Sequence, residues 1–530
     1  MSKITNELEW LVDIYGHNYQ KSVPDEVEKI KLSQLVSKLG FVYEKFRNAI
    51  DYNEEHLVRR NSLERLLKRQ ILFLQERRPQ QISQTLIYEF IRAGYLPNNQ
   101  LPETVIEEVA TIIIKYLEIF NCLHGQRLAN YGKLAAWLIS LAACEINEYL
   151  VPQERETAMV NFMYSHLVDN LAFTKTKIEE KEKNLQIYLA TLRTFSNADT
   201  VALNYGLLKL YLPNWRQADK NEIQSFCQNI NIIKNKIEAH IKHSIGFQLT
   251  RTVRSQAVFF TVLNQLMQKN AGQLKEVLDD PKTLEEKIEE IALANYHRIR
   301  SKLMGTIFRV IIYIFFTKTI LAFILELPYD YLFIKQVDWY ALSVNVLFHP
   351  LLMFFLAMTI RVPGTKNTKI IIEEIKNIVY GTERKIGFKA KKSLKRGSFS
   401  YFVFNTIYLL MFIVSFGIII KILNLIHFNI ISGILFVFFL TIVSFFGFRL
   451  RNLAKQFSVL PRKDSLFNFL VDFISLPIIR VGRFFSTNFS KINIFLFILD
   501  FIIETPFKLL IEFLEKTVSF IKEKREEIAE

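Results

Sequence analysis

The chain has 530 residues, 50% of them hydrophobic, with 17 Gly, 13 Pro and 3 Cys, which excludes collagen-like, disordered and disulfide-scaffold proteins. Its mean hydropathy of +0.16 is high for a soluble protein and low for one that lies in a membrane throughout, so we expect a soluble part joined to a membrane part. Residues 1–300 hold 38 Lys and Arg against 36 Asp and Glu, whereas residues 301–530 hold 29 against 16. Because the excess positive charge lies beside the apolar segments, it indicates membrane topology and argues against nucleic acid as a partner.

Residues 1–300 predict an all-helical cytosolic domain. Helix-start signals stand after Ser22, at Pro102 and at Asp280, each followed by apolar residues at helical spacing. Thr283 and Glu286 have the spacing of a capping box at the last of these starts. Alternation of period two is absent over any useful length, so we expect no strands. The N-terminus has no apolar segment of the signal-peptide type, and we expect this domain to stay in the cytosol.

Two features of this half are candidates for a function. The segment His56–Arg78 reads as a basic amphipathic helix, which could contact anionic lipid, an acidic partner or nucleic acid. The solvated face of an ordinary packed helix is the simpler interpretation. His240 and His243 stand beside Glu238 at a spacing that could hold a metal, but no third ligand is identifiable, and we expect no metal and no cofactor. The three widely spaced cysteines are expected to be reduced core residues.

Four apolar stretches of residues 301–460 are long enough to cross a hydrocarbon core of roughly 30 Å, which takes about 20 helical residues. They are residues 306–327, 339–360, 401–423 and 430–448. The expected cytosolic loop 361–399 holds 11 Lys and Arg against three Glu, whereas the loops 328–338 and 424–429 together hold one Lys. Basic residues also precede the first stretch and follow the fourth. This alternation predicts a multi-pass protein of the cytoplasmic membrane with both termini inside the cell.

The basic loop and the C-terminal region both predict contact with the bilayer surface. Seven basic residues are expected to meet anionic headgroups, at about 1 kcal/mol for each one near the surface. They are Arg384, Lys385, Lys389, Lys391, Lys392, Lys395 and Arg396. In residues 461–530 a narrow charged stripe, including Asp500 and Lys516, runs along an otherwise apolar pattern. We expect amphipathic helices that lie in the headgroup plane or pack on the membrane helices, with two further spans as the alternative.

Polar residues inside the predicted spans form a candidate site. Lys318 lies near the middle of the first span and His349 near the middle of the second, with Asn345 one turn before it and Asn405 in the third span. Ionisable groups are costly in a bilayer and are therefore functional candidates. A transport site would use Lys318 as a charge and His349 as a titratable group. Packing inside the helix bundle is the other interpretation, and the sequence places no acidic residue at a depth that matches Lys318.

The predicted fold class is all-α. It comprises a cytosolic multi-helix domain (1–300), a membrane domain with four transmembrane helices (301–460) and amphipathic membrane-associated helices (461–530). Neither a nucleophile elbow, a phosphate-binding loop nor a dinucleotide fingerprint is present, so we expect no enzyme. A membrane-anchored scaffold or adaptor, binding a protein partner through residues 1–300, is the simplest function. A small channel or transporter at Lys318 and His349 is the first alternative, and a membrane-bound enzyme acting at the inner leaflet is the second.

Overall fold

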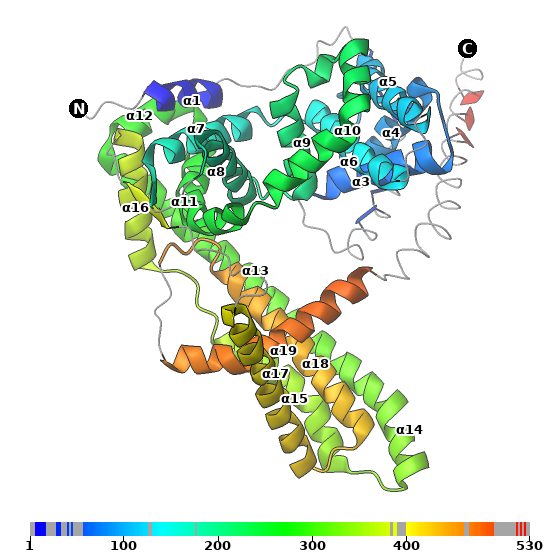
Figure 1. Cartoon of the computed structure of the whole chain (residues 1–530), viewed down its shortest axis with the longest axis vertical. Coiled ribbons are helices and arrows are strands. Elements are labelled where there is room, and N and C mark those ends of the chain that lie inside the picture. Colours follow the sequence, from blue (N-terminus) through cyan, green and yellow to red (C-terminus); the bar gives the residue numbers. More distant parts are fainter. Residues whose placement is uncertain are drawn as a thin grey trace. The chain divides into compact units, whose positions relative to one another are not determined.

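The computed structural model is an all-α protein, which confirms the predicted fold class (Figure 1). The structure describes residues 6–16, 28–32, 40–41, 44–45, 57–125, 130–174, 178–381, 385–389, 399–460 and 466–491, with scattered residues between 513 and 525. The chain divides into two compact units. Unit 1 comprises residues 1–16, 165–177 and 251–492, and unit 2 comprises residues 17–164, 178–250 and 493–530.

Unit 2 is built from helices of ordinary length around one apolar core. Its elements are α3 (Val58–Leu67), the π-helix η1 (Lys68–Phe73), α4 (Pro79–Arg92), α5 (Thr104–Gly125), α6 (Tyr131–Leu150), α8 (Glu180–Thr194), α9 (Thr200–Tyr211), the 3-10 helix η2 (Trp215–Gln217) and α10 (Lys220–Ile241). Helices α7 (Glu154–Asn170) and α11 (Ser244–Lys269) have residues in both units. The ring of Trp215 packs in the core against Tyr116 and Phe226. The helix predicted to start at Pro102 is present as α5, and the start after Ser22 lies outside the described residues.

Unit 1 contains the long helices. Its elements are α1 (Asn6–Gly16), β1 (Leu171–Thr174), the 3-10 helix η3 (Ala271–Gln273), α12 (Leu274–Asp279), α13 (Pro281–Leu321), the π-helix η4 (Ala322–Glu326), α14 (Leu327–Tyr329), the π-helix η5 (Asp330–Ile334), α15 (Trp339–Met358), α16 (Thr365–Tyr380), β2 (Ile386–Lys389), α17 (Phe399–Leu425), α18 (Ile430–Ala454) and α19 (Leu466–Lys491). Helix α13 starts where the sequence predicts. Its N-cap is Asp280, whose carboxylate accepts from the backbone N–H groups of Lys282 and Thr283, and not Thr283 as the capping-box spacing suggested.

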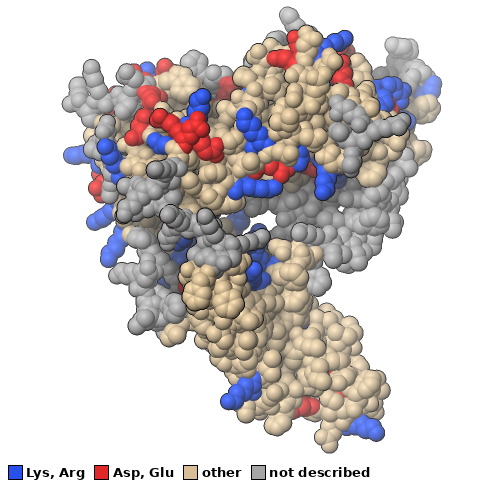
Figure 2. Space-filling model, in the orientation of Figure 1, with Lys and Arg blue, Asp and Glu red and all other residues tan. Residues whose placement is uncertain are grey.

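Four helical segments of unit 1 are long and apolar enough to cross a membrane. They are Pro281–Ile334, Trp339–Met358, Phe399–Leu425 and Ile430–Ala454, which contain or largely overlap the four predicted stretches. Figure 2 shows that the visible face of this part of unit 1 is almost free of charge along its length, with Lys, Arg, Asp and Glu near its ends. Helices α6 and α7 pass the same test only as a pair bent by 109°. Uncharged helical surface of this length is typical of lipid contact and indicates a multi-pass membrane protein.

The segment between the second and third spans contains helix α16, which differs from the predicted loop. Helix α16 lies within it and contacts α13, with Ile371, Ile375 and Val379 buried along one side. This spacing of four residues forms one apolar stripe on a helix. The sequence shows this apolar stripe as plainly as it shows the basic charge of the segment.

A short parallel pair of strands contradicts the expectation of no strands. Leu171 to Thr174 of β1 pair in register with Ile386 to Lys389 of β2, and the rings of Phe173 and Phe388 meet edge to face at 4.9 Å. Each strand has four residues, which is too short to display a period-two pattern, and the partner lies more than 200 residues away along the chain. A local sequence pattern therefore carried no sign of this pairing.

Helix α19 crosses α17 and α18 (Figure 1), as one of the predicted forms of the C-terminal region requires. The approach is closest at Gly482, where an added Cβ atom would overlap the backbone carbonyl of Thr441 and contact Phe445. Thr441 lies eight residues before Arg449, or about 12 Å along a helix at about 1.5 Å per residue. Helix α19 therefore contacts α18 inside its apolar length. The charged stripe predicted from Asp500 onward lies almost entirely outside the described residues.

Replacing Gly482 is expected to displace α19. In Gly482→Ala the new methyl group meets a backbone oxygen, which cannot rotate away as a side chain can, so the helices must separate at an expected loss of about 1–3 kcal/mol. Unfolding of the purified protein in detergent measures this loss. Gly433→Ala in α18 is the matched control because its Cβ meets nothing within 4 Å. Equal stability of the two variants would contradict the close crossing.

Candidate functional site

Polar side chains from three apolar segments meet in the interior of unit 1. Lys318 of α13, Glu326 of η4, Asn345 and His349 of α15 and Ser432 of α18 are all buried, the first four completely. The structure thus brings together three of the four residues that the sequence predicted for an intramembrane site. We call this group of five residues the polar cluster.

The amide of Asn345 links the two charged members of the polar cluster. Its Oδ1 accepts a hydrogen bond of 2.6 Å from the Lys318 ammonium, and its Nδ2 donates to both carboxylate oxygens of Glu326 at 2.7 Å. Only one orientation of the amide satisfies both neighbours, since the ammonium only donates and the carboxylate only accepts. Asn345 therefore connects a positive and a negative charge whose sum is zero.

Glu326 is an acidic partner for Lys318 that the sequence pattern did not predict, since it lies about two turns further along the helix and reaches Lys318 through the Asn345 amide. Its carboxylate also accepts from the Ser432 hydroxyl at 2.9 Å. In an α-helix of about 3.6 residues per turn, the eight residues from Lys318 to Glu326 advance about 80° beyond two turns, which would aim the side chains apart. The π-helix η4 places an extra residue in the intervening turn and reduces this offset. The sequence pattern gave no sign of that π turn.

The start of α18 is fixed to the same region. Asn429 is the N-cap of α18, where its side-chain oxygen accepts from the backbone N–H of Ser432 at 2.7 Å. Its side-chain nitrogen donates to the Asp330 carboxylate at 2.5 Å. Since Asp330 begins η5, this cap ties α18 to the end of the first span.

His349 and an aromatic surround complete the polar cluster. The two ring nitrogens of His349 face the backbone carbonyl oxygens of Asn345 at 3.1 Å and Phe436 at 3.0 Å. A neutral imidazole donates to one of these oxygens, and an imidazolium donates to both. Lys318 lies over the ring of Phe439, with its Nζ 4.8 Å from the ring centroid. The ammonium therefore has an amide oxygen and an aromatic face as neighbours, which compensates for the loss of water.

The remaining predicted site residues lie elsewhere or cannot be placed. Asn405 is exposed on α17 and has no described contact with the polar cluster. Among the basic residues expected at headgroups, Lys385 is exposed and Lys389 belongs to β2. The other five lie outside the described residues: Arg384, Lys391, Lys392, Lys395 and Arg396.

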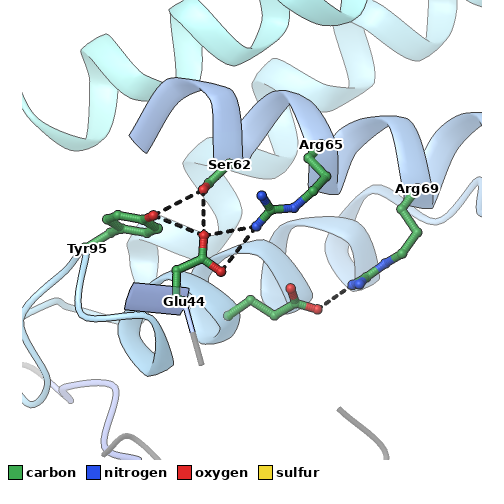
Figure 3. A network of polar contacts seen from close by, with 6 residues as sticks. Glu44, Ser62, Arg65, Arg69 and Tyr95 are labelled. Carbon is green, nitrogen blue, oxygen red and sulfur yellow. Dashed lines mark hydrogen bonds and ion pairs between the residues drawn. The ribbon is translucent and has the colours of Figure 1, made fainter. Parts of the chain in front are cut away.

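The basic segment His56–Arg78 contains α3 and η1, and four of its six arginines pair with acidic groups of unit 2, whereas Arg59 donates to the amide oxygen of Asn147. Figure 3 shows Glu44 accepting hydrogen bonds from Ser62 at 2.9 Å, from Tyr95 at 3.0 Å and from Arg65 at 3.0 Å, with Arg69 paired to a further glutamate. The glutamate that pairs with Arg69 is Glu89, and further ion pairs in the described part of the segment are Arg60–Asp199, Lys68–Glu64 and Arg78–Glu76. This geometry supports a packed helix in preference to a surface that recruits an anionic partner.

His240 and His243 form no metal site with the acidic or thiol groups that the structure describes. The imidazole of His240 instead lies between Glu182 and Tyr211, with 2.8 Å from Nδ1 to a carboxylate oxygen and 2.8 Å from Nε2 to the phenolic oxygen. The neighbour that the sequence suggested, Glu238, pairs with Lys234 and Lys242 of its own helix. These i, i+4 pairs are typical of a solvated helix face.

Known proteins provide no guide to the role of the polar cluster. Comparisons of the chain with protein-family models, curated proteins and solved structures find no match.

Proposed function

We propose that the protein is a membrane-anchored helical scaffold whose N-terminal helices bind a protein partner. The observation that carries this proposal is the burial of the polar cluster, whose members are hydrogen-bonded to one another. Lys318, Glu326 and Asn345 are fully buried and hydrogen-bonded to one another, and their charges cancel. A transport site needs polar groups that meet water and exchange partners. A cluster whose members are buried and bonded to one another instead fixes how α13, α15 and α18 pack, which is what an anchor requires.

The distribution of charge supports a cytoplasmic membrane protein with both termini inside the cell. Exposed Arg298, Arg300 and Lys302 lie on α13 before its apolar part, and exposed Arg449 lies near the end of α18. Lys335, also exposed, is the one basic residue of the 328–338 connection. Loops rich in Lys and Arg stay in the cytoplasm, so the ends of the bundle near 300 and 450 face inward under this proposal.

Exposed apolar side chains of unit 2 support a protein partner for the soluble helices. Phe73 and Leu74, at the end of η1, are 68% and 63% exposed, and Ile232 on α10 is 66% exposed. Single exposed apolar residues are ordinary, but an adjacent pair beside Arg77 and Arg78 resembles the aromatic and arginine content of protein interfaces. We place partner binding at Phe73 and Leu74.

Photocrosslinking in intact cells tests this partner site. A photoreactive amino acid at Phe73 of the full chain is expected to give a discrete higher-mass adduct, because a bound partner covers the side chain. The same residue at Gln84, an exposed polar position on α4, is the control and should give none. Absence of a discrete adduct at Phe73 and at Leu74, with the protein present at normal abundance, would contradict the proposed scaffold.

A further inference from the structure

Three helices of unit 2 supply a carboxylate, an imidazole and a hydroxyl in line. Glu182 comes from α8, His240 from α10 and Tyr211 from the last position of α9. A Glu182 carboxylate oxygen lies 2.8 Å from Nδ1 of His240, and the Tyr211 hydroxyl lies 2.8 Å from Nε2. An acid that orients a base, with the base on a hydroxyl, is the arrangement by which enzymes activate a nucleophile.

The surroundings set the direction of proton transfer. Gln186 donates to Glu182 at 2.7 Å and to the backbone carbonyl of His240 at 2.9 Å, which holds both groups in place. Burial alone would raise the pKa of Glu182, but hydrogen bonds from Gln186 and His240 outweigh it and lower that pKa. In the neutral imidazole of His240, the Glu182 carboxylate can only accept, so the ring proton facing it lies on Nδ1. The Nε2 lone pair is then directed at the Tyr211 hydroxyl.

The relay is within reach of solvent. The side chains of His240 and Glu182 are 19% and 20% exposed, and Tyr211 is half-buried. Burial and the nearby charge of Glu182 raise the pKa of Tyr211, so its hydroxyl keeps its proton at neutral pH and needs a base to react. Exposed Lys236 places its Nζ 4.9 Å from the centroid of the Tyr211 ring. This cation would attract a negatively charged reactant and stabilise a developing phenolate.

We propose that Tyr211 is a base-activated nucleophile for electrophiles of the phosphoryl class, that is, oxygen-bearing tetrahedral centres with a nearby negative charge. In the reaction the Tyr211 oxygen forms the new bond to the electrophilic centre and its proton passes to Nε2 of His240. The leaving group departs with the electrons of the bond that breaks. The role of Lys236 is to bind the negative charge of the reactant. This inference is independent of the membrane anchor and of the partner site at Phe73.

A sulfonyl fluoride provides a direct probe, since its sulfur is a tetrahedral, oxygen-bearing centre and fluoride is the leaving group. The full chain in detergent is treated with 4-(fluorosulfonyl)benzoate, and the adduct at each tyrosine is quantified by peptide mass spectrometry. Tyr131 is the internal control because it is also half-buried and lies beside a histidine ring. Its ring centroid is 5.9 Å from that of His124. Tyr211 is expected to react at least ten times faster than Tyr131.

Variants separate reactivity from a purely structural contact. His240→Gln is expected to reduce labelling of Tyr211 to the rate of Tyr131, and Glu182→Gln to reduce it several-fold. Lys236→Ala should remove the preference for the anionic probe over neutral benzenesulfonyl fluoride while the helical circular dichroism is unchanged. Equal rates at Tyr211 and Tyr131 in the parent chain, or unchanged labelling in a folded His240→Gln or Glu182→Gln variant, would overturn the proposal.

Discussion

Removing Glu326 alone, as Glu326→Leu, is expected to destabilise the membrane bundle by about 3–5 kcal/mol. The change leaves the Lys318 ammonium buried without its counter-charge and removes the acceptor of the Asn345 and Ser432 hydrogen bonds. Lys318→Met is expected to have a similar effect because it leaves the carboxylate of Glu326 uncompensated. Removing either charge alone is therefore expected to lower the stability of the bundle strongly.

The double variant tests whether Lys318 and Glu326 compensate each other's charge or contribute independently to stability. Lys318→Met with Glu326→Leu removes both charges, and it should recover most of the stability that each single change loses. Unfolding in detergent, with each single and the double variant, gives the coupling energy. Asn405→Leu is the control, since Asn405 is exposed on α17 and its replacement should be nearly neutral. Additive losses in the double variant would contradict charge compensation through Asn345.

A second large effect is expected from the buried ion pair of unit 2. Lys115 donates to Glu145 at 2.6 Å and to the carbonyl oxygen of Trp215 at 2.6 Å, and the Tyr116 hydroxyl donates to the other Glu145 oxygen at 2.9 Å. Burial lowers the pKa of Lys115 and raises that of Glu145. Each charged side chain therefore depends on the other to offset its loss of hydration. Glu145→Gln should therefore destabilise unit 2 by about 3–5 kcal/mol, because the ammonium loses its counter-charge.

Chemical denaturation followed by tryptophan fluorescence measures this loss, since Trp215 lies beside the pair. Lys115→Met combined with Glu145→Gln should be less destabilised than Glu145→Gln alone, because it removes the ammonium that the single change leaves without a counter-charge. The exposed pair Lys209–Glu148 provides the control. Glu148→Gln is expected to change stability by less than about 1 kcal/mol. Equal effects of Glu145→Gln and Glu148→Gln would show that burial of the first pair has no energetic consequence.

The main features of the fold could be predicted from apolar patterning. Some 20 consecutive apolar residues in a helix need a membrane or a protein core around them, so the four long helices were readable from hydropathy alone. The start of α13 was readable because Asp280 and Pro281 form a local signal. The boundaries and lengths of these helices depend on local sequence signals, and for this reason the four predicted stretches agree with the structure.

The direction of each side chain within the apolar helices was harder to predict from the sequence. Helix α17 is apolar on all sides, so its pattern did not reveal that Asn405 points away from the other polar residues. Glu326 stands next to the end of the predicted stretch 306–327, and the π turn that aims it at Asn345 depends on the packed structure. Glu182, His240 and Tyr211 come from three helices, so their contacts depend on the packed structure, and the sequence pattern indicates only His240 as a candidate.

The proposed anchor function predicts whether water enters the interior of the helix bundle. If the polar cluster only fixes helix packing, the interior around His349 and Lys318 is dry in the native membrane. If the bundle were a transport path, the same groups would meet water on at least one side. Thiol chemistry separates the two because maleimides react with hydrated thiolates and not with thiols packed in a dry interior.

The most direct measurement is labelling of His349→Cys in intact membranes with a membrane-impermeant maleimide, in a chain whose three native cysteines are replaced. Lys335→Cys, an exposed position in the connection 328–338, is the positive control. The proposed anchor predicts protection of His349→Cys from both sides and labelling of Lys335→Cys from outside the cell alone. Labelling of His349→Cys from either side, in a protein that remains folded, would contradict the closed polar cluster and favour a hydrated path.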